Sequence, residues 1–367
     1  MLLSRWILHC CVLALCGCLA AGCRPDDPQP SSAPPRLARE LALYNWPDDI
    51  PRSVLEAFTR EFGVKVVYQT FQSQEEAVAA LLDGKVYDVA VLENPFIPPL
   101  VAANRLKELN FRHIPNFRNI SANFRDLAAD PGNRYTVPYH YGTTGLLVRT
   151  DLVGQTVRRW SDLWQPRLQG KVAMRAQSRE LLGLTLLSLG YSLNSEKPSE
   201  IDAAVERLIA LKPQVRWVEV DTPKAVAKLL DGSAPVLLGW PMDYQVAHAA
   251  NPAVAYILPE EGTALWSDNY VIPASSPNVY TAEVFINFLL RPEISAQIVN
   301  ERSYPTANEA ALDLIKPEVR NDPVIFPPAE ALRRAHFYRP LSREGETLYQ
   351  RAWDRFLAAP PALDGQP

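Results

Sequence analysis

Hydrophobic and polar positions follow two different periods along the chain, and together they predict alternating strands and helices. The apolar runs LALYNW, VKVVYQTF and YDVAVLE, between residues 41 and 93, have the length and composition of buried strands. The segments IPRSVLEAFTREFG and SQEEAVAALLDG lie between them, carry apolar residues at helical spacing and end in glycine. Three strands joined by two helices indicate a parallel α/β sheet.

A second α/β run follows a β-rich passage at residues 135–153, where two glycines are interpreted as loosening a crossing between lobes. Strands are expected at GKVAMR, VRWVEV and PVLLGW, and helices at residues 178–191, 200–213 and 222–232. Residues 254–273 have the pattern of a return crossing, and residues 281–301 form a helical region interrupted at Pro292. The chain is therefore expected to form two α/β lobes.

The N-terminus has the composition of a secretion signal. One early positive charge is followed by an apolar stretch and then by small residues up to Cys23. The ending LAAGC is similar to a bacterial lipoprotein processing site, so we expect a signal peptide at residues 1–22 and lipidation of Cys23. Cys18 is a competing site, and a plain cleaved signal peptide is the alternative. The Pro- and Ser-rich residues 24–36 are interpreted as a tether.

Composition excludes several classes of function. The net charge of -4 and the lack of a basic run argue against nucleic-acid binding. All five cysteines lie at or before Cys23, so the part after it has no thiolate chemistry. No nucleophile elbow, zinc-protease motif or phosphate-binding glycine loop occurs. No cofactor or metal is expected, and the four later histidines are interpreted as ordinary surface or core residues: His113, His140, His248 and His336.

Tryptophan and aspartate occur two residues apart at two places in the chain. The segment ALWSDNYVIP contains Trp266 and Asp268, and LALYNWPDD contains Trp46 and Asp48. Side chains two apart on a strand point to the same face. In parallel α/β sheets ligands bind beyond the carboxyl ends of the strands, where Trp46, Asp48 and Glu93 are expected to meet.

Aromatic rings and carboxylates together suit a ligand with ammonium groups and alkyl spacers. Ring faces attract cations and pack on methylenes, and carboxylates accept charge-assisted hydrogen bonds. A tryptophan in a strand is nevertheless more often a core residue, and an acid in the first turn of a helix is favoured by the dipole alone. The case therefore depends on the joint pattern, whose members are Trp46, Asp48, Glu93, Tyr141, Glu180, Trp240, Trp266, Asp268 and Tyr304.

The order of these motifs resembles a known family. YNW, YDVAV, VPYHYGTTG, SDLWQPRLQGKV, SRE, VLLGW, LWSDNYVIP, FLLRPEISAQ, YPTANEAA and EVRNDPVIFPP follow one another between about residues 41 and 357. Together they are similar to the polyamine (spermidine/putrescine) substrate-binding proteins of bacterial ABC importers. The resemblance implies an α/β, type II, two-lobe periplasmic binding fold with the ligand cleft between the lobes. Expected boundaries are 37–142 plus 268–303 for lobe 1, 143–267 plus 304–358 for lobe 2, and 359–367 for a tail.

The resemblance also implies roles for individual residues. Asp268 is expected to bind an amine, and Trp266 to pack on the methylene stem. The other cleft residues implied are Trp46, Asp48, Glu180, Trp240 and Tyr304.

The chain departs from the family pattern at several positions. Gln177 stands where spermidine-binding members carry an aspartate, and Glu93 and Pro95 replace a serine and a tyrosine. Tyr338 replaces a late cleft glutamine. One carboxylate is lost and another gained across the cleft, so the resemblance leaves open which polyamine is bound.

The sequence therefore predicts a lipid-anchored periplasmic or cell-surface monomer that binds a linear polyamine and delivers it to an ABC permease without catalysis. One alternative is the same fold binding a different cationic amine. Another is a sensor or surface lipoprotein that does not transport. An enzyme using paired carboxylates is the weakest alternative.

Overall fold

The computed structural model describes residues 35–154, 156–218 and 222–360. The predicted signal peptide, Cys23 and the tether up to residue 34 lie outside the described residues, so those expectations stay predictions. From Leu37 onward the chain forms a single unit. Within the described ranges no helix has the length and apolar character needed to cross a bilayer.

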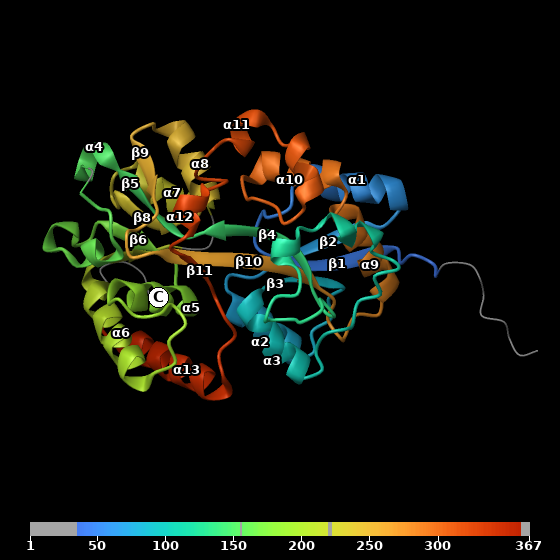
Figure 1. Cartoon of the computed structure of the whole chain (residues 1–367), viewed down its shortest axis with the longest axis horizontal. Coiled ribbons are helices and arrows are strands. Elements are labelled where there is room, and N and C mark those ends of the chain that lie inside the picture. Colours follow the sequence, from blue (N-terminus) through green and yellow to red (C-terminus); the bar gives the residue numbers. More distant parts are fainter. Residues whose placement is uncertain (1–34, 155, 219–221, 361–367) are drawn as a thin grey trace, which may run out of the picture. The chain divides into compact units, whose positions relative to one another are not determined.

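The first sheet combines the strands predicted near the N-terminus with strands from distant parts of the chain (Figure 1). As predicted, β1 pairs in parallel with both β2 and β3. The long strand β10 runs antiparallel to β3 and β4 and parallel to β11. The sheet contains β1 (Glu40–Asn45), β2 (Lys65–Thr70), β3 (Val89–Glu93), β4 (Val137–Thr143), β10 (Thr263–Val271) and β11 (Ala335–Phe337).

The second sheet has the order β7-β6-β8-β5-β9. β6 pairs in parallel with β7 and β8, whereas β5 runs antiparallel to β8 and β9. The β-rich passage at residues 135–153 therefore supplies one strand to each sheet. The second sheet contains β5 (Gly145–Arg149), β6 (Val172–Met174), β7 (Val215–Trp217), β8 (Val236–Gly239) and β9 (Val254–Ile257).

Helices flank both sheets (Figure 1) and begin and end at recognisable signals. The first helix ends at Gly63 in the left-handed conformation, and the hydroxyl of Ser73 caps the second. The predicted break at Pro292 separates α9 from α10. The α-helices are α1 (Arg52–Phe62), α2 (Gln74–Leu82), α3 (Ile97–Ala102), α4 (Thr150–Val153), α5 (Ser178–Ser188), α6 (Pro198–Leu211), α7 (Thr222–Leu230), α8 (Pro241–Ala250), α9 (Val279–Leu289), α10 (Pro292–Arg302), α11 (Pro317–Arg320), α12 (Ala329–Leu332) and α13 (Arg343–Ala358). Short 3-10 helices lie at Asn94–Phe96, Pro115–Asn119, Ala122–Phe124, Trp160–Trp164, Pro166–Leu168, Lys212–Gln214 and Glu309–Leu314.

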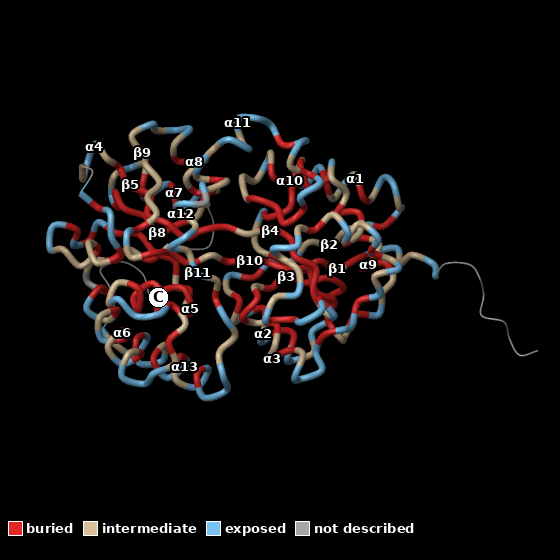
Figure 2. The backbone as a smooth tube through the Cα atoms, viewed as in Figure 1, coloured by how far each residue is buried: buried red, intermediate tan, exposed pale blue. Residues whose placement is uncertain are grey.

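Each sheet has its own hydrophobic core, and the buried segments run along both sheets (Figure 2). In the first core the rings of Phe285 and Phe288 each lie about 5 Å from the ring of Phe58, centroid to centroid. Trp160 and Leu182 are buried in the second core. Burying one large apolar side chain contributes roughly 1.5–3 kcal/mol, so both cores can hold rigid strand ends. We call the part around the first sheet lobe 1 and the part around the second lobe 2.

The packing differs from the expected boundary at residue 304. Ala311 and Ile315 pack against Ala296 and Val299 of α10, so this segment continues lobe 1 before the chain returns to lobe 2. Pairing of Tyr141 with the Pro305 carbonyl ties it to the first sheet as well. This continuation was not predictable from the sequence, because short 3-10 segments have no strong apolar period.

Strand β10 takes part in both cores. Ala264 and Trp266 at its start pack in the second core, whereas Tyr270 near its end packs in the first. The helix α13 packs on lobe 2 through Tyr349 and Phe356. Side chains on β10 are therefore held by both lobes at once.

Two glycines of the β-rich passage allow aromatic rings to approach the backbone. A Cβ at Gly142 would lie 2.2 Å from Cζ2 of Trp266, and one at Gly145 would lie 2.5 Å from Cζ of Tyr256. The reason for glycine is therefore close approach, in addition to the loosening that the sequence suggested.

Gly142→Ala should lower the free energy of unfolding by roughly 1–3 kcal/mol, because the new methyl overlaps a buried ring. Urea denaturation measures the change. In a Trp266→Leu background the same alanine should cost much less, because the overlapping ring atoms are gone. Equal costs in both backgrounds would contradict the steric account.

Candidate ligand-binding cleft

A cavity of about 420 Å³ opens where strand ends of both lobes meet. The ends of β1 and β3 reach it from lobe 1, and the ends of β6 and β8 lead into it from lobe 2. Its lining includes every residue predicted for the site except Tyr141. The lining residues are Trp46, Pro47, Asp48, Asp49, Gln74, Glu75, Glu93, Phe96, His140, Gln177, Arg179, Glu180, Thr222, Pro223, Trp240, Met242, Val246, Trp266, Asp268, Arg302, Tyr304 and Tyr338.

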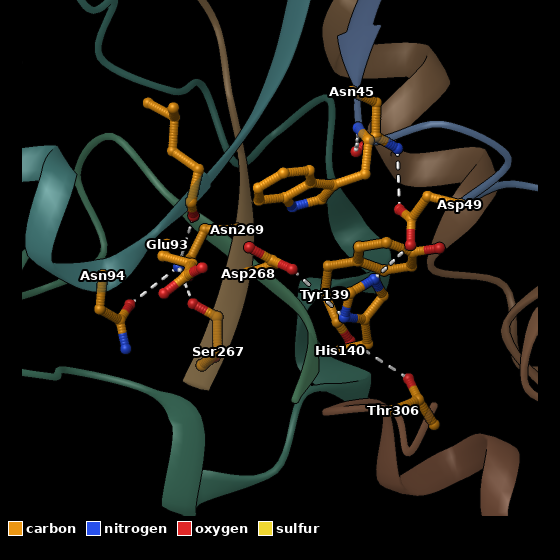
Figure 3. A network of polar contacts seen from close by, with 12 residues as sticks. Asn45, Asp49, Glu93, Asn94, Tyr139, His140, Ser267, Asp268, Asn269 and Thr306 are labelled. Atoms are coloured by element: carbon orange, nitrogen blue, oxygen red, sulfur yellow. Dashed lines mark hydrogen bonds and ion pairs between the residues drawn. The ribbon is translucent and has the colours of Figure 1, made fainter. Parts of the chain in front are cut away.

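Asp268 lies between Glu93 and His140 (Figure 3). It is paired in the antiparallel register directly opposite Glu93 of β3. On its other side, Nδ1 of His140 lies 3.6 Å from Oδ2 of Asp268. Oδ1 of Asp268 is buried and has no hydrogen-bond partner among the described residues.

The pKa values of the two opposed carboxyls, Asp268 and Glu93, are both raised. Burial raises the pKa of the Asp268 carboxyl well above its usual range, and the nearby charges of Glu93 and Asp49 raise it further. Burial, with Glu180 and Glu75, raises the pKa of Glu93 to about 8, although Arg179 acts in the opposite direction. Like charges directly opposite each other in a sheet are destabilising. This end of the cavity therefore favours a positive charge or a retained proton.

Glu180 supplies a carboxylate from lobe 2. Its Oε1 accepts hydrogen bonds from Oγ1 of Thr144 at 2.5 Å and from Nε1 of Trp240 at 3.3 Å. Its Oε2 is buried and unpartnered among the described residues. Burial raises the pKa of the Glu180 carboxyl, and the two hydrogen bonds partly offset that effect. The first-turn position that the sequence identified thus places one free oxygen beside the cavity.

Aromatic side chains from both lobes form the walls. The rings of Trp46 and Trp240 come from opposite lobes, with centroids 6.5 Å apart. The ring of Tyr304 lies edge-on to that of Trp266 at 5.4 Å. The guanidinium carbon of Arg175 lies 4.3 Å from the centroid of the Trp240 ring and so helps to hold it. Such rings provide apolar surface and negative faces for a cationic ligand.

The two aspartates after β1 have different surroundings. Asp48, which the sequence singled out, is mostly exposed and accepts a hydrogen bond from Nη2 of Arg302 at 2.8 Å. Asp49 is buried, and its Oδ2 accepts a 2.8 Å hydrogen bond from Nδ2 of Asn45. The backbone of Asp48 is left-handed, with a φ of 57°. This turn directs the second acid inward, which the spacing alone did not reveal.

Tyr141 does not line the cavity, contrary to the prediction. Its ring stacks on that of Phe124 at 4.6 Å. The neighbouring His140, which was interpreted as an ordinary surface or core residue, lines the cavity instead. Adjacent residues of a strand point to opposite faces, so only one of His140 and Tyr141 can face the cavity. The predicted segment does reach the cavity, but through His140 and not through Tyr141.

Gln177 and Tyr338, the two residues of lobe 2 that differ from the family pattern, act in different ways. Nε2 of Gln177 donates a 2.9 Å hydrogen bond to the carbonyl of Gln72, and thus joins the lobes. The hydroxyl of Ser178 bonds to Glu75 and makes a second link between them. Tyr338 is buried against the cavity beneath the guanidinium of Arg179, 5.1 Å from its ring centroid.

Acidic side chains outnumber basic ones in the lining of the cavity. Both lining arginines have partners: Arg302 bonds to Asp48, and Arg179 to Asn194. No group of His, Cys, Asp and Glu within the described ranges has the arrangement of a metal site. The lining carboxyls are Asp48, Asp49, Glu75, Glu93, Glu180 and Asp268. The site is therefore suited to an organic cation.

Glu93→Gln should stabilise the ligand-free protein at pH 8, with little effect near pH 4.5. In the folded state the Glu93 pKa is raised from 4.5 to about 8, so the folded protein holds a proton that the unfolded chain releases. Stability is lost as pH rises between these values, and glutamine removes that loss. Urea denaturation at both pH values should show a gain of about 1–3 kcal/mol at pH 8.

Glu56→Gln is the matched control for this comparison. Glu56 forms an exposed helical ion pair with Arg52, so its loss should change stability by less than about 0.5 kcal/mol at either pH. A gain for Glu93→Gln of the same size at both pH values would contradict the raised pKa.

Comparison with known families agrees with this architecture. Residues 53–327 match the model of a family described as bacterial extracellular solute-binding protein. A putative spermidine/putrescine ABC transporter protein from Listeria monocytogenes has a similar solved structure, with a TM-score of 0.82 and 30% identity. The similarity covers 87% of this chain and 99% of that one. The predicted two-lobe α/β binding-protein fold is thereby confirmed.

Similar curated proteins are described by their ligands. The spermidine/putrescine-binding periplasmic protein of Escherichia coli (strain K12) is 31% identical over 359 residues, which are 97% of this chain and 99% of that protein. A putrescine/agmatine-binding protein of Pseudomonas aeruginosa (strain ATCC 15692) is 33% identical over 333 residues, covering 85% and 90%.

Proposed function

The chain belongs to the bacterial extracellular solute-binding proteins, and we propose that its cleft binds a linear polyamine for delivery to an ABC permease. The observation that carries this proposal is a pair of buried carboxyl oxygens, one from each lobe, that have no hydrogen-bond partner in the part of the chain that the structure describes. Asp268 Oδ1 belongs to lobe 1, and Glu180 Oε2 belongs to lobe 2. Two ammonium groups joined by an alkyl chain would occupy both oxygens.

The walls complement such a ligand. Trp46, Trp240 and Trp266 offer ring faces and apolar edges to methylene groups. Each charge-assisted contact contributes roughly 1.5–3 kcal/mol, and micromolar affinity needs about -8 kcal/mol. Two or three such contacts with ring packing reach that value after the cost of ordering the ligand. The relatives named for spermidine and putrescine support the same chemical class.

The links between the lobes support a hinge mechanism. Gln177 and Ser178 of lobe 2 bond to Gln72 and Glu75 of lobe 1 beside the cavity. A ligand that contacts Asp268 and Glu180 together favours the same approach of the lobes. The permease then distinguishes loaded from empty protein through this closed arrangement, because only a differential contact can signal occupancy.

A different cationic amine is the second candidate ligand. Glu93 adds a carboxyl opposite Asp268 in lobe 1, and Gln177 removes one from lobe 2. The charge of the cavity is thus concentrated at one end. A ligand whose charge is concentrated at one end would prefer this site to a symmetric diamine.

The location proposed for the protein follows from its family and its N-terminus. The family is described as extracellular, and the similar E. coli protein is described as periplasmic. Both descriptions support a location outside the cytoplasm. We propose that Cys23 carries lipid and that residues 24–36 join it to the binding unit. We also propose that the protein is a monomer. We also propose that the protein binds and releases its ligand without catalysis.

Calorimetric titration of the purified protein with putrescine, cadaverine, spermidine and spermine tests the ligand class. One-to-one binding of one or two of these is expected. Asp268→Asn should weaken that binding by about 10- to 150-fold, because a charge-assisted contact is lost. Asp313→Asn, which alters an exposed ion pair with Arg320, is the matched control and should change nothing. A folded sample that binds none of the four would contradict the proposal.

Asp48→Asn separates the two acids that follow β1. Its carboxylate is exposed and paired with Arg302, so we expect at most about a threefold loss of affinity in the same titration. A loss as large as that of Asp268→Asn would show that Asp48 binds the ligand directly.

A further inference from the structure

We propose that His140 is a positioning residue that joins Asp49 to Asp268, and that His140 and Asp268 share a proton that a bound ammonium group displaces. This proposal rests on the proposed function for the identity of the displacing cation. It does not depend on that function for the link between the three residues, which the geometry carries alone (Figure 3).

A bulge in the sheet directs His140 toward Asp268. Along β4 and β10, Ser267 pairs with Tyr141 and Asn269 pairs with Pro138. One residue of β10, Asp268, therefore stands opposite two residues of β4, Tyr139 and His140. Bulges re-aim side chains and are frequent beside functional sites. Here Tyr139 packs in the core of lobe 1, whereas His140 faces the cavity.

The imidazole is enclosed on all sides. Its ring stacks on that of Tyr304 at 5.1 Å and lies edge-on to that of Trp266 at 5.7 Å. The Tyr139 ring lies 4.0 Å away on its own strand. The charged groups that face the imidazole are Asp49 from the loop after β1 and Asp268 from β10. Glu93 stands next in line, opposite Asp268.

The surroundings of the imidazole favour a second proton beside it. Nε2 lies 2.8 Å from Oδ1 of Asp49, which is hydrogen-bond distance. Nδ1 is buried, has no hydrogen-bond partner among the described residues, and lies 3.6 Å from Oδ2 of Asp268. A neutral imidazole carries one ring proton, so a lone pair on Nδ1 would otherwise face a carboxylate. The second proton resides on either the imidazole or Asp268.

A ligand ammonium group changes this balance. Contact with the free Oδ1 of Asp268 brings a positive charge to the same carboxyl. That charge replaces the proton, which leaves for solvent. Asp268 becomes a carboxylate paired with the ligand ammonium, and His140 stays beside it as a neutral imidazole with one ring proton. No bond other than the one to this proton breaks or forms. Removing Asp268 should likewise change the protonation of the imidazole.

Nitrogen-15 NMR of histidine-labelled protein tests the link. The described histidines are His113, His140, His248 and His336, and the spectrum of His140→Gln assigns the signal of interest. Adding spermidine or putrescine at neutral pH should shift the ring nitrogens of His140 and leave the others in place. In ligand-free protein, Asp268→Asn should shift the same signals.

Binding measurements on two matched variants complete the test. His140→Gln should reduce the proton release that accompanies polyamine binding and so flatten the pH dependence of affinity, because glutamine can bond to Asp49 but cannot hold the extra proton. His113→Gln alters a partly buried contact with Glu283 in lobe 1, outside the cavity lining, and should leave affinity and its pH dependence unchanged. A ligand that binds without moving the His140 signals, with Asp268→Asn also silent, overturns the proposal.

If no polyamine binds, the ligand assignment fails, but the comparison of ligand-free wild type with Asp268→Asn still decides the link. Shifted His140 signals in that comparison support it, and unchanged signals overturn it.

Discussion

Buried negative charge at the strand ends is the constraint on which the cleft depends. Two carboxyls, Asp268 and Glu93, stand directly opposite each other on neighbouring strands, and Glu180 approaches from the other lobe. Burying a charge without a partner is costly, so such groups either keep a proton or receive a cation. Each nearby feature can be understood as meeting that requirement: the raised pKa values, the imidazole of His140, and the buried oxygens of Asp268 and Glu180 that have no hydrogen-bond partner among the described residues.

Two separate cores make this arrangement tolerable. Each lobe buries its own set of aromatic and aliphatic side chains, which stabilise strands whose ends carry the unfavourable groups. Strand β10 enters both cores, so Trp266 and Asp268 are held at fixed positions between the lobes. Gly142 leaves room for the indole at the backbone. The links from Gln177 and Ser178 then set how closely the lobes approach.

Much of this organisation was predictable from the sequence. The alternation of apolar periods predicted the two α/β halves and the break at Pro292, and the strand ends predicted where the acids would gather. The Trp-x-Asp pair of β10 shares the cavity as expected. These features are local, because period, caps and strand ends are written within short segments.

What the sequence did not reveal depends on contacts between distant residues. A bulge in the pairing of β4 with β10 decides that His140 faces the cavity and Tyr141 does not. A left-handed residue at Asp48 exposes that acid and turns Asp49 inward. The continuation of lobe 1 past residue 304 depends on packing against α10. None of these three features has a recognisable sequence pattern within a single helix, strand or turn.

The most direct measurement of the central claim is a crystal structure of the protein with spermidine bound. The account predicts one ligand nitrogen within hydrogen-bond distance of Oδ1 of Asp268 and another at Oε2 of Glu180, with methylenes between the tryptophan rings. A ligand that leaves both oxygens without contact, or that binds outside the cleft, would contradict it.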